Sequence, residues 1–303
     1  MLFSEYTKIK QVGKTHFSKI FQVLKVGSQD IYALFKIPKV HNKKNINLDI
    51  NILKDINHPN IIKFFDFKED ADNFYAISEY GTGEILEAFL DKKEKPFSEE
   101  EAQYIMKKVI NIAKYLNDKK IVHRDLNTEN LLIYFEPEDD VIENNILKAK
   151  IKLIDYSLST RIKKGELLDD FHGRIVNVAP EIFRKKNYDE KVDIWSLGVL
   201  CSKLLTKEFA YDAQLLRNDD NVFYYLPQTL SKEAVSFINC MLQYDPNLRK
   251  SADNLAKHEF LTKNIKDFNK IKIEDIKEHI EDSKIKIHIK DNQWVTEYFG
   301  WGL

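Results

Sequence analysis

The residue types that could do chemistry gather in two short segments. The segment 121–130, IVHRDLNTEN, holds Arg124, Asp125 and Asn130, and KLIDYS places Asp155 25 residues beyond Asn130. Carboxylates and amides are the types that can take up a proton or hold a divalent cation. The alternative interpretation is an acidic residue that caps a turn near an unrelated Asn. The rest of the sequence must decide between these two interpretations.

Composition excludes several classes of protein. Of 303 residues, 43% are hydrophobic and 31% charged, and the formal net charge is −1, which argues against a disordered tail or a polycation that binds nucleic acid. No apolar run reaches the roughly 18 residues of a membrane span, and MLFSEYTK lacks an apolar signal core. Cys201 and Cys240 lie far apart in apolar segments, so we expect thiols in a reducing compartment, cytoplasmic or nuclear.

The hydrophobic pattern divides the chain into two regions. Up to about residue 95, short apolar runs broken by turn residues predict strands, with one helical stretch, LDINILKDI. From Ser98 onward the pattern is helical, and Ser98 with Glu101 forms a capping box. VDIWSLGVLCSKLL is apolar nearly all round, which predicts a buried helix. We therefore expect a small β-rich lobe and a larger helical lobe that join near residues 79–83.

Motifs in a fixed order extend the two chemical segments. After HRDL and IDYS come VAPE at 178–181, VDIWSLGV at 192–199 and YDPNLR at 244–249. In this order they resemble the eukaryotic protein kinases over about residues 6–261. The local sequence, for example HPNIIKFFDF, is most similar to that of the calcium/calmodulin-type and calcium-dependent Ser/Thr kinases. No EF-hand loop follows the domain, so direct calcium binding is not expected.

The resemblance implies an α+β, two-lobed protein kinase fold. Its small lobe would be an antiparallel β-sheet with one helix, and its large lobe would be mainly α-helical. It implies a kinase-like domain over 1–261 and a C-terminal tail, 262–303. Within that domain, the lobes and hinge take these predicted bounds: N-lobe about 6–80, hinge about 79–83, C-lobe about 84–261.

The resemblance also implies chemistry: phosphoryl transfer from ATP, with Mg²⁺, to a protein hydroxyl. Asp125 matches the catalytic base, and Asn130 and Asp155 match the side chains that hold magnesium. Arg124 and Asn127 complete the catalytic loop, where Asn127 stands at a position usually held by Lys. The positions that match the nucleotide-binding residues of the family are Val12, Gly13, Ile20, Ala33, Lys36, Asp49, Glu79 and Gly81.

Several nucleotide-binding positions depart from the family pattern. The chain has only nine glycines, and in the phosphate loop only Gly13 remains, with Thr15 and Ser18 at the other glycine positions. Backbone amides approach phosphates closely only where no Cβ intrudes, so we expect this loop to bind the phosphates of ATP weakly. A plain β-hairpin without phosphate contact is an equal alternative.

The strand lysine is displaced by one position. In IYALFKIPK the family lysine would stand two residues after Ala33, on the same face of the strand, and that position is Phe35. Lys36 would reach the nucleotide only through a bulge or a one-residue slip. Its partner carboxylate aligns with Asp49, where the family has the longer Glu.

Other matches are structural. Glu181 and Arg249 are expected to form a buried ion pair, and Asp193 is expected to hold the backbone of HRD. The segment between Asp155 and Glu181 has hydroxyls only near its start. We therefore hypothesise that one of Asp169 and Asp170 pairs with Arg124 in place of a phosphate. Two solvated aspartates are the alternative.

Two functions remain in competition. The retained Asp125, Asn130 and Asp155 favour a Ser/Thr protein kinase, whereas the altered nucleotide positions favour a pseudokinase, a protein-binding or allosteric module. In both cases the expected partner is a protein, not nucleic acid or a membrane. The tail, where alternation in KIKIHI indicates a strand, is either a regulatory segment or an element packed on the large lobe.

Overall fold

A computed structural model shows two compact units, residues 1–86 with 129–161 and residues 87–128 with 162–303. Each unit is described by itself. The residues that the structure describes are 5–14, 18–39, 50–81, 83–135, 145–173, 175–209, 224–227, 229–267, 285–290 and 293–298.

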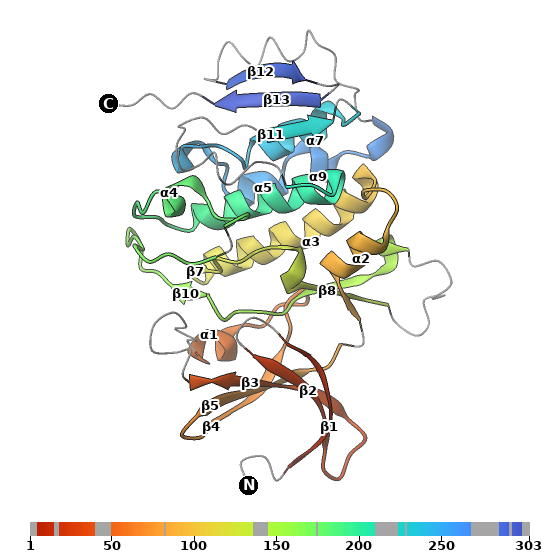
Figure 1. Cartoon of the computed structure of the whole chain (residues 1–303), viewed down its shortest axis with the longest axis vertical. Helices are drawn as coiled ribbons and strands as arrows, with labels where there is room; N and C mark the ends of the chain where they lie inside the picture. The colour runs from red at the N-terminus through yellow and green to blue at the C-terminus, as the bar shows by residue number, and fades with distance from the viewer. Residues whose placement is uncertain are drawn as a thin grey trace. The chain divides into compact units, whose positions relative to one another are not determined.

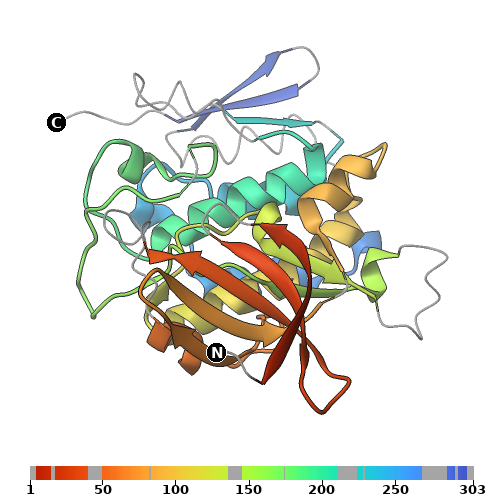
Figure 2. The ribbon, with the colours of Figure 1, turned by 60° about the horizontal axis from the view of Figure 1, so that its bottom comes forward.

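The first unit is built on a five-stranded antiparallel sheet with the order β1-β2-β3-β5-β4 (Figures 1 and 2). Alternating burial along β3 fits a strand with apolar residues on both faces. One short helix, α1 (Ile50–Asp55), precedes β4. The strands are β1 (Tyr6–Lys14), β2 (Lys19–Lys25), β3 (Ile31–Pro38), β4 (Phe64–Glu69) and β5 (Asn73–Glu79).

A second, three-stranded sheet completes the first unit. Its order is β6-β8-β9, and it is antiparallel throughout. The segment after α1 joins the two sheets, because the backbone of Asn60 and Ile62 exchanges hydrogen bonds of 2.9 Å with Leu153. Residues 129–161 therefore belong to the unit that contains the N-terminal strands. The strands of this sheet are β6 (Glu84–Ile85), β8 (Leu131–Tyr134) and β9 (Lys150–Leu153); β10 (Thr160–Arg161), at the end of the unit, does not belong to it.

The second unit is mainly helical. In α3 (Glu99–Asp118) the predicted capping box is confirmed, since Ser98 Oγ accepts from the Glu101 amide and the Glu101 carboxylate accepts from the Ser98 amide. The predicted buried helix is α5 (Lys191–Thr206), which is buried on nearly every side. The other elements are α2 (Leu86–Lys92), β7 (Ile121–Val122), α4 (Pro180–Phe183), α7 (Lys232–Asn239), α8 (Ala252–Ala256) and α9 (Glu259–Thr262).

The C-terminal tail adds strands to the second unit. β12 (Ile285–Lys290) and β13 (Gln293–Tyr298) form an antiparallel hairpin, and β13 pairs with β11 (Tyr224–Pro227), as Figure 1 shows. The alternation in KIKIHI indicated the strand that is now β12. The tail thus contributes two strands to a sheet whose third strand comes from residues before α7.

The predicted fold class is confirmed: an antiparallel β-sheet forms the N-terminal lobe, and helices form most of the C-terminal lobe. Among the described residues, no helix combines the length and apolar character needed to cross a bilayer.

Candidate active site

The register of β3 decides where the displaced lysine lies. Positions 31–36 pair in order with β2, and positions 32–38 pair in order with β5, with no bulge in β3. Ala33 and Phe35 are buried in one apolar cluster on one face, so Lys36 lies on the opposite face. The interpretation in which a bulge or slip brings Lys36 to the nucleotide side is therefore wrong, because the ladder is regular on both sides.

Phe35 occupies the position where the family pattern has lysine. Its ring is 7% exposed and lies 6.0 Å from the Phe64 ring, in a cluster that also contains Ala76. An ammonium group at this position would have to be buried among aromatic rings, which is costly without a partner. Asp49, the predicted partner of the lysine, lies outside the described residues.

The β1–β2 hairpin carries the predicted phosphate loop. The two strands pair as far as Lys14 and Lys19, which confirms a hairpin here. Val12 is 39% exposed, whereas Ile20 packs against the cluster around Phe35. Gly13 lies opposite Ile20 in the ladder. Thr15, at the second glycine position, lies outside the described residues.

The predicted hinge begins at the end of β5. The Glu79 carboxylate accepts a hydrogen bond from the Lys63 amide at 2.8 Å and pairs with Lys152 Nζ at 2.5 Å. Glu79 therefore links β5 to β9 through its side chain. At Gly81 a Cβ would come within 2.5 Å of Leu132 on β8, so glycine allows the hinge backbone to lie against that strand.

The two predicted metal ligands, Asn130 and Asp155, both belong to the first unit. Asn130 ends the short 3₁₀ turn Thr128–Asn130, and its carbonyl accepts a hydrogen bond of 3.0 Å from the amide of Ile154, the neighbour of Asp155. The backbone thus brings the two ligand positions side by side. Burial raises the pKa of Asp155, while the Ser157 amide, 2.9 Å from Oδ1, favours its ionised form.

This donor set fits Mg²⁺, which prefers oxygen ligands and keeps several of its waters. A carboxylate and an amide oxygen supply such ligands without forming a closed protein cage. The described residues contain no group of three or more His, Cys, Asp or Glu side chains that could hold a metal ion.

The HRD loop of the second unit is anchored at His123 and Arg124 by Asp193. The Asp193 carboxylate accepts hydrogen bonds from the backbone amides of His123 at 2.7 Å and Arg124 at 2.8 Å, as predicted. Burial raises the pKa of Asp193 to about 6, although the two amides favour its ionised form. Arg124 adopts a positive φ of 66°, a backbone conformation that these bonds help to hold.

The same loop is tied down around Asp125. The Asp125 amide donates to His123 Nδ1 at 3.2 Å, and Asn127 Nδ2 donates to Asp125 Oδ1 at 2.8 Å. Beyond Asn127, the Thr128 hydroxyl donates to the Glu87 carboxylate. The carboxylate that matches the catalytic base is therefore held by its neighbours in a defined orientation.

The Arg124 side chain contacts the segment that follows β10 in the chain. Its Nη1 lies 2.9 Å from both carboxylate oxygens of Asp170, and its side chain is only 2% exposed. Tyr188 donates its hydroxyl to Asp170 at 2.7 Å, and His172 Nε2 lies 2.7 Å from the other oxygen. The hypothesis that an aspartate pairs with Arg124 is confirmed for Asp170; both Asp169 and Asp170 are exposed, and it is Asp170 that reaches Arg124.

The pairing keeps Asp170 ionised. Burial alone would raise the pKa of Asp170, but the Tyr188 hydrogen bond and the Arg124 charge outweigh it, so the pKa lies below its usual range. Gly173, close by with φ +101°, is required for space as well, since a Cβ there would lie 2.9 Å from the Arg124 carbonyl oxygen.

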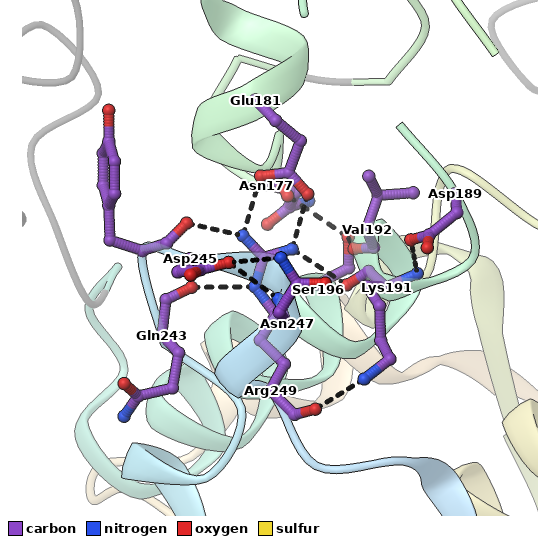
Figure 3. Close-up of polar contacts among 11 residues, drawn as sticks. Asn177, Glu181, Asp189, Lys191, Val192, Ser196, Gln243, Asp245, Asn247 and Arg249 are labelled. Atoms are coloured by element: carbon purple, nitrogen blue, oxygen red, sulfur yellow. Dashed lines mark hydrogen bonds and ion pairs between the residues drawn. The ribbon is translucent and has the colours of Figure 1, made fainter. Parts of the chain in front are cut away.

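The predicted ion pair between Glu181 and Arg249 is also confirmed (Figure 3). Arg249 Nη1 and Nη2 bond the two Glu181 oxygens at 2.6 and 2.7 Å, and the guanidinium is fully buried. Its Nε donates to the Gln243 carbonyl at 2.8 Å, and Nη1 donates to the Lys191 carbonyl at 3.0 Å. This pair ties α4 to the start of α5 and to the segment after α7.

Sequence reasoning missed two ion pairs near the site. Glu87 receives Lys203 Nζ at 2.5 Å as well as the Thr128 hydroxyl, and Glu79 pairs with Lys152. Their members are 116 and 73 residues apart in the chain and belong to no motif. No local pattern could have found them.

The sheet-and-helix architecture, the anchored HRD loop and the buried Glu–Arg pair together define a protein kinase fold. A family model for the protein kinase domain matches residues 6–261, and the chain belongs to this family.

Relatives include several Ser/Thr kinases. The chain is 32% identical to the Serine/threonine-protein kinase polo of Drosophila melanogaster, over 84% of this chain and 44% of the relative. It is 31% identical to the Serine/threonine-protein kinase atg1 of Dictyostelium discoideum, over 87% and 40%. It is 31% identical to Calcium-dependent protein kinase 4 of Plasmodium berghei, over 86% and 50%. The chain thus spans half or less of the length of these relatives.

Proposed function

We propose that this chain is a Ser/Thr protein kinase that transfers the γ-phosphoryl group of ATP to a hydroxyl of a protein substrate. One observation carries the proposal: the loop that holds Asp125 is anchored on both sides of that residue. Asp193 bonds the amides of His123 and Arg124, and Glu87 bonds the Thr128 hydroxyl. A carboxylate that acts as a base must be held in place. The retained anchors favour catalysis over a scaffold that needs only the fold.

The proposed reaction assigns each residue a task. The substrate hydroxyl oxygen forms a bond to the γ-phosphorus, the bond from that phosphorus to the β,γ-bridging oxygen breaks, and ADP leaves. The hydroxyl proton passes to the Asp125 carboxylate. Arg124 and Asp170 keep the following segment in place without a phosphate on it. The substrate is therefore expected to meet a preformed surface.

Asn130 and Asp155 are the residues that would hold Mg²⁺. The ion neutralises negative charge on the phosphates when it is bound. The chain itself contributes the oxygen donors, and the Ser157 amide orients one oxygen of Asp155. We also propose a cytoplasmic or nuclear location, which the free thiols of Cys201 and Cys240 support.

A pseudokinase is the second candidate, and one observation favours it. Lys36 lies on the face of β3 opposite to Ala33, and Phe35 fills the lysine position within an apolar cluster. A site without that lysine lacks one cation for the phosphates. In this alternative the chain serves as a protein-binding or allosteric module.

Two measurements on the full chain separate the candidates. The first is the thermal shift caused by ATP with and without Mg²⁺, and the second is ³²P transfer to itself and to a generic protein substrate. The wild type is expected to show a Mg²⁺-dependent shift and slow transfer. Asp125→Asn should lower transfer by about 10²- to 10⁴-fold and leave the shift unchanged.

The control is Asp118→Asn, the same change at an exposed aspartate at the end of α3. It should behave as the wild type. Transfer that is absent from the wild type would contradict the kinase proposal and favour the module. Transfer that persists in Asp125→Asn would point to a contaminating kinase.

A further inference from the structure

We propose that the face of the five-stranded sheet opposite to Phe35 is a docking surface for an acidic segment of a partner protein. Three lysines on adjacent strands lie at its centre. Lys14 on β1 is paired in register with Lys19 on β2, and Lys19 is paired with Lys36 on β3 (Figure 1). Residues directly opposite each other point to the same face of a sheet. These three residues are called the lysine row, and the inference holds for a kinase and for a pseudokinase alike.

The lysine row places like charges directly opposite one another without compensation. Cβ atoms of such residues are about 5 Å apart, and like charges at this spacing are destabilising. The same register continues through Tyr75 to Lys68, and Lys68 has a counter-charge, since its Nζ lies 3.4 Å from Asp66 Oδ2. Among the residues that the structure describes, no carboxylate forms an ion pair with the lysine row. An anionic partner would supply the missing counter-charge.

The lysine row is accessible to another molecule. Lys14 and Lys19 are exposed, and Lys36 is half-buried. A fourth ammonium group lies on the same face, because Lys8 Nζ is 3.7 Å from the centre of the Phe21 ring. Phe21 follows Lys19 by two positions on β2, so the two side chains share a face. Positive charge is therefore concentrated on β1, β2 and β3.

The charge pattern beyond β3 favours a narrow partner. On β4 the Asp66 carboxylate pairs with Lys68. Nearby, Asp70 accepts a hydrogen bond of 2.8 Å from the Tyr75 hydroxyl. A flat anionic bilayer or a nucleic acid would meet these carboxylates as well as the lysines. An extended acidic segment can instead follow the lysine row alone, which spans about 10 Å because neighbouring strands are about 4.8 Å apart.

The test measures binding of a short fluorescent peptide of alternating Glu and Ser to the full chain by anisotropy. The wild type is expected to bind this Glu peptide and not the same peptide with Gln in place of Glu. Changing the lysine row to Lys14→Gln, Lys19→Gln and Lys36→Gln together should weaken binding of the Glu peptide by about tenfold, because each exposed ion pair contributes a factor of about two.

The matched control makes the same charge change at three exposed lysines of the second unit, Lys163→Gln, Lys250→Gln and Lys257→Gln. It should bind the Glu peptide as the wild type does. Equal weakening in both triple variants would overturn the inference, because it would show a response to net charge alone. Wild-type affinity in the variant of the lysine row would overturn it as well, and so would a wild type that does not bind the Glu peptide.

Two further arms separate the classes of anion. Vesicles that contain phosphatidylserine and a DNA duplex are each tested with the wild type and with the variant of the lysine row. Neither is expected to show binding that depends on the lysine row. If either binds in this way and the Glu peptide does not, the assignment to an acidic protein segment is overturned.

A last readout does not require a ligand. Lys19→Glu places a carboxylate between Lys14 and Lys36 and should raise Tm by about 1 to 3 °C at low salt, because two repulsive cross-strand pairs become attractive. Lys257→Glu, at an exposed position of the second unit, is the control and should leave Tm unchanged. A Tm that does not rise in Lys19→Glu would overturn the uncompensated repulsion on which the inference depends.

Discussion

At two positions the kinase pattern has a lysine and this chain has an uncharged residue: Phe35 on β3 and Asn127 in the HRD loop. The surroundings of the two residues differ. In the first unit Phe35 stands at the lysine position and packs in an apolar cluster with Ala33, Ala76 and Phe64. In the second unit Asn127 keeps a hydrogen bond to Asp125. Likewise, Asp170 forms an ion pair with Arg124.

The difference shows that a substitution is tolerated in two distinct ways. At a sheet face that packs against apolar side chains, a charged residue can be replaced by an apolar one, because hydrophobic burial stabilises the replacement. A site on an anchored loop keeps buried polar partners, and these are costly to leave unpaired. Changes in the second unit are therefore compensated by polar contacts, and changes in the first unit by packing.

The largest effect is expected from the buried ion pair of the second unit. Arg249→Ala leaves Glu181 as a buried, unpaired carboxylate and should cost about 3 to 5 kcal/mol of unfolding free energy. Urea unfolding of the wild type and Arg249→Ala measures this loss of unfolding free energy. The control is Arg161→Ala in the first unit, whose partner Asp55 has a 58% exposed side chain, and it should cost less than about 1 kcal/mol. Equal costs would contradict the assignment of Arg249 as a structural anchor.

The next effect separates the two neighbours on β3. Phe35→Ala removes a buried ring and should cost about 3 kcal/mol of stability, whereas Lys36→Ala should stay within about 0.5 kcal/mol. Lys36→Ala should also leave the Kd for ATP unchanged by calorimetry, because Lys36 lies on the other face of the sheet. A tenfold weaker Kd would show that Lys36 reaches the nucleotide after all.

A smaller effect is expected at Asp170, the aspartate that pairs with Arg124. Asp170→Asn removes the counter-charge of Arg124 and should destabilise the segment by about 1 to 2 kcal/mol, allowing for partial solvent exposure. Limited proteolysis between residues 162 and 178 should be faster. Asp169→Asn, one residue away and exposed, is the matched control and should be cut at the wild-type rate. Equal rates in both variants would remove the role given to Asp170.

The last expected effect is a pH dependence of stability at Asp193. Its folded pKa of about 6 lies above the usual aspartate value, so its stabilising contribution is complete below about pH 4 and is lost as the pH rises through 6. The stability of the wild type relative to Asp193→Asn should therefore improve between pH 7 and pH 4. Urea unfolding at several pH values measures this difference, and a constant difference would contradict the raised pKa.

Local sequence patterns predicted much of the fold. The capping box at Ser98 and the all-round apolar pattern of α5 each depend on neighbours within a few residues, which is why they could be predicted. The motif order predicted the Glu181–Arg249 pair, and the lack of hydroxyls late in the segment 155–181 led to the hypothesis that an aspartate pairs with Arg124. It could not choose between Asp169 and Asp170, because the choice depends on where Tyr188 and Arg124 lie in space.

By itself, the sequence determined the family and, in outline, the order of strands and helices, and it supplied the candidates for the residues that carry the chemistry. Only the tertiary structure decided the face of Lys36, since a strand keeps or loses its register through hydrogen bonds to both neighbouring strands. It also decided the contacts of Glu79 with Lys152 and of Asn127 with Asp125. Such contacts depend on packing between segments that are distant in the chain or on loop geometry. Neither can be predicted from the local periodicity of hydrophobic residues.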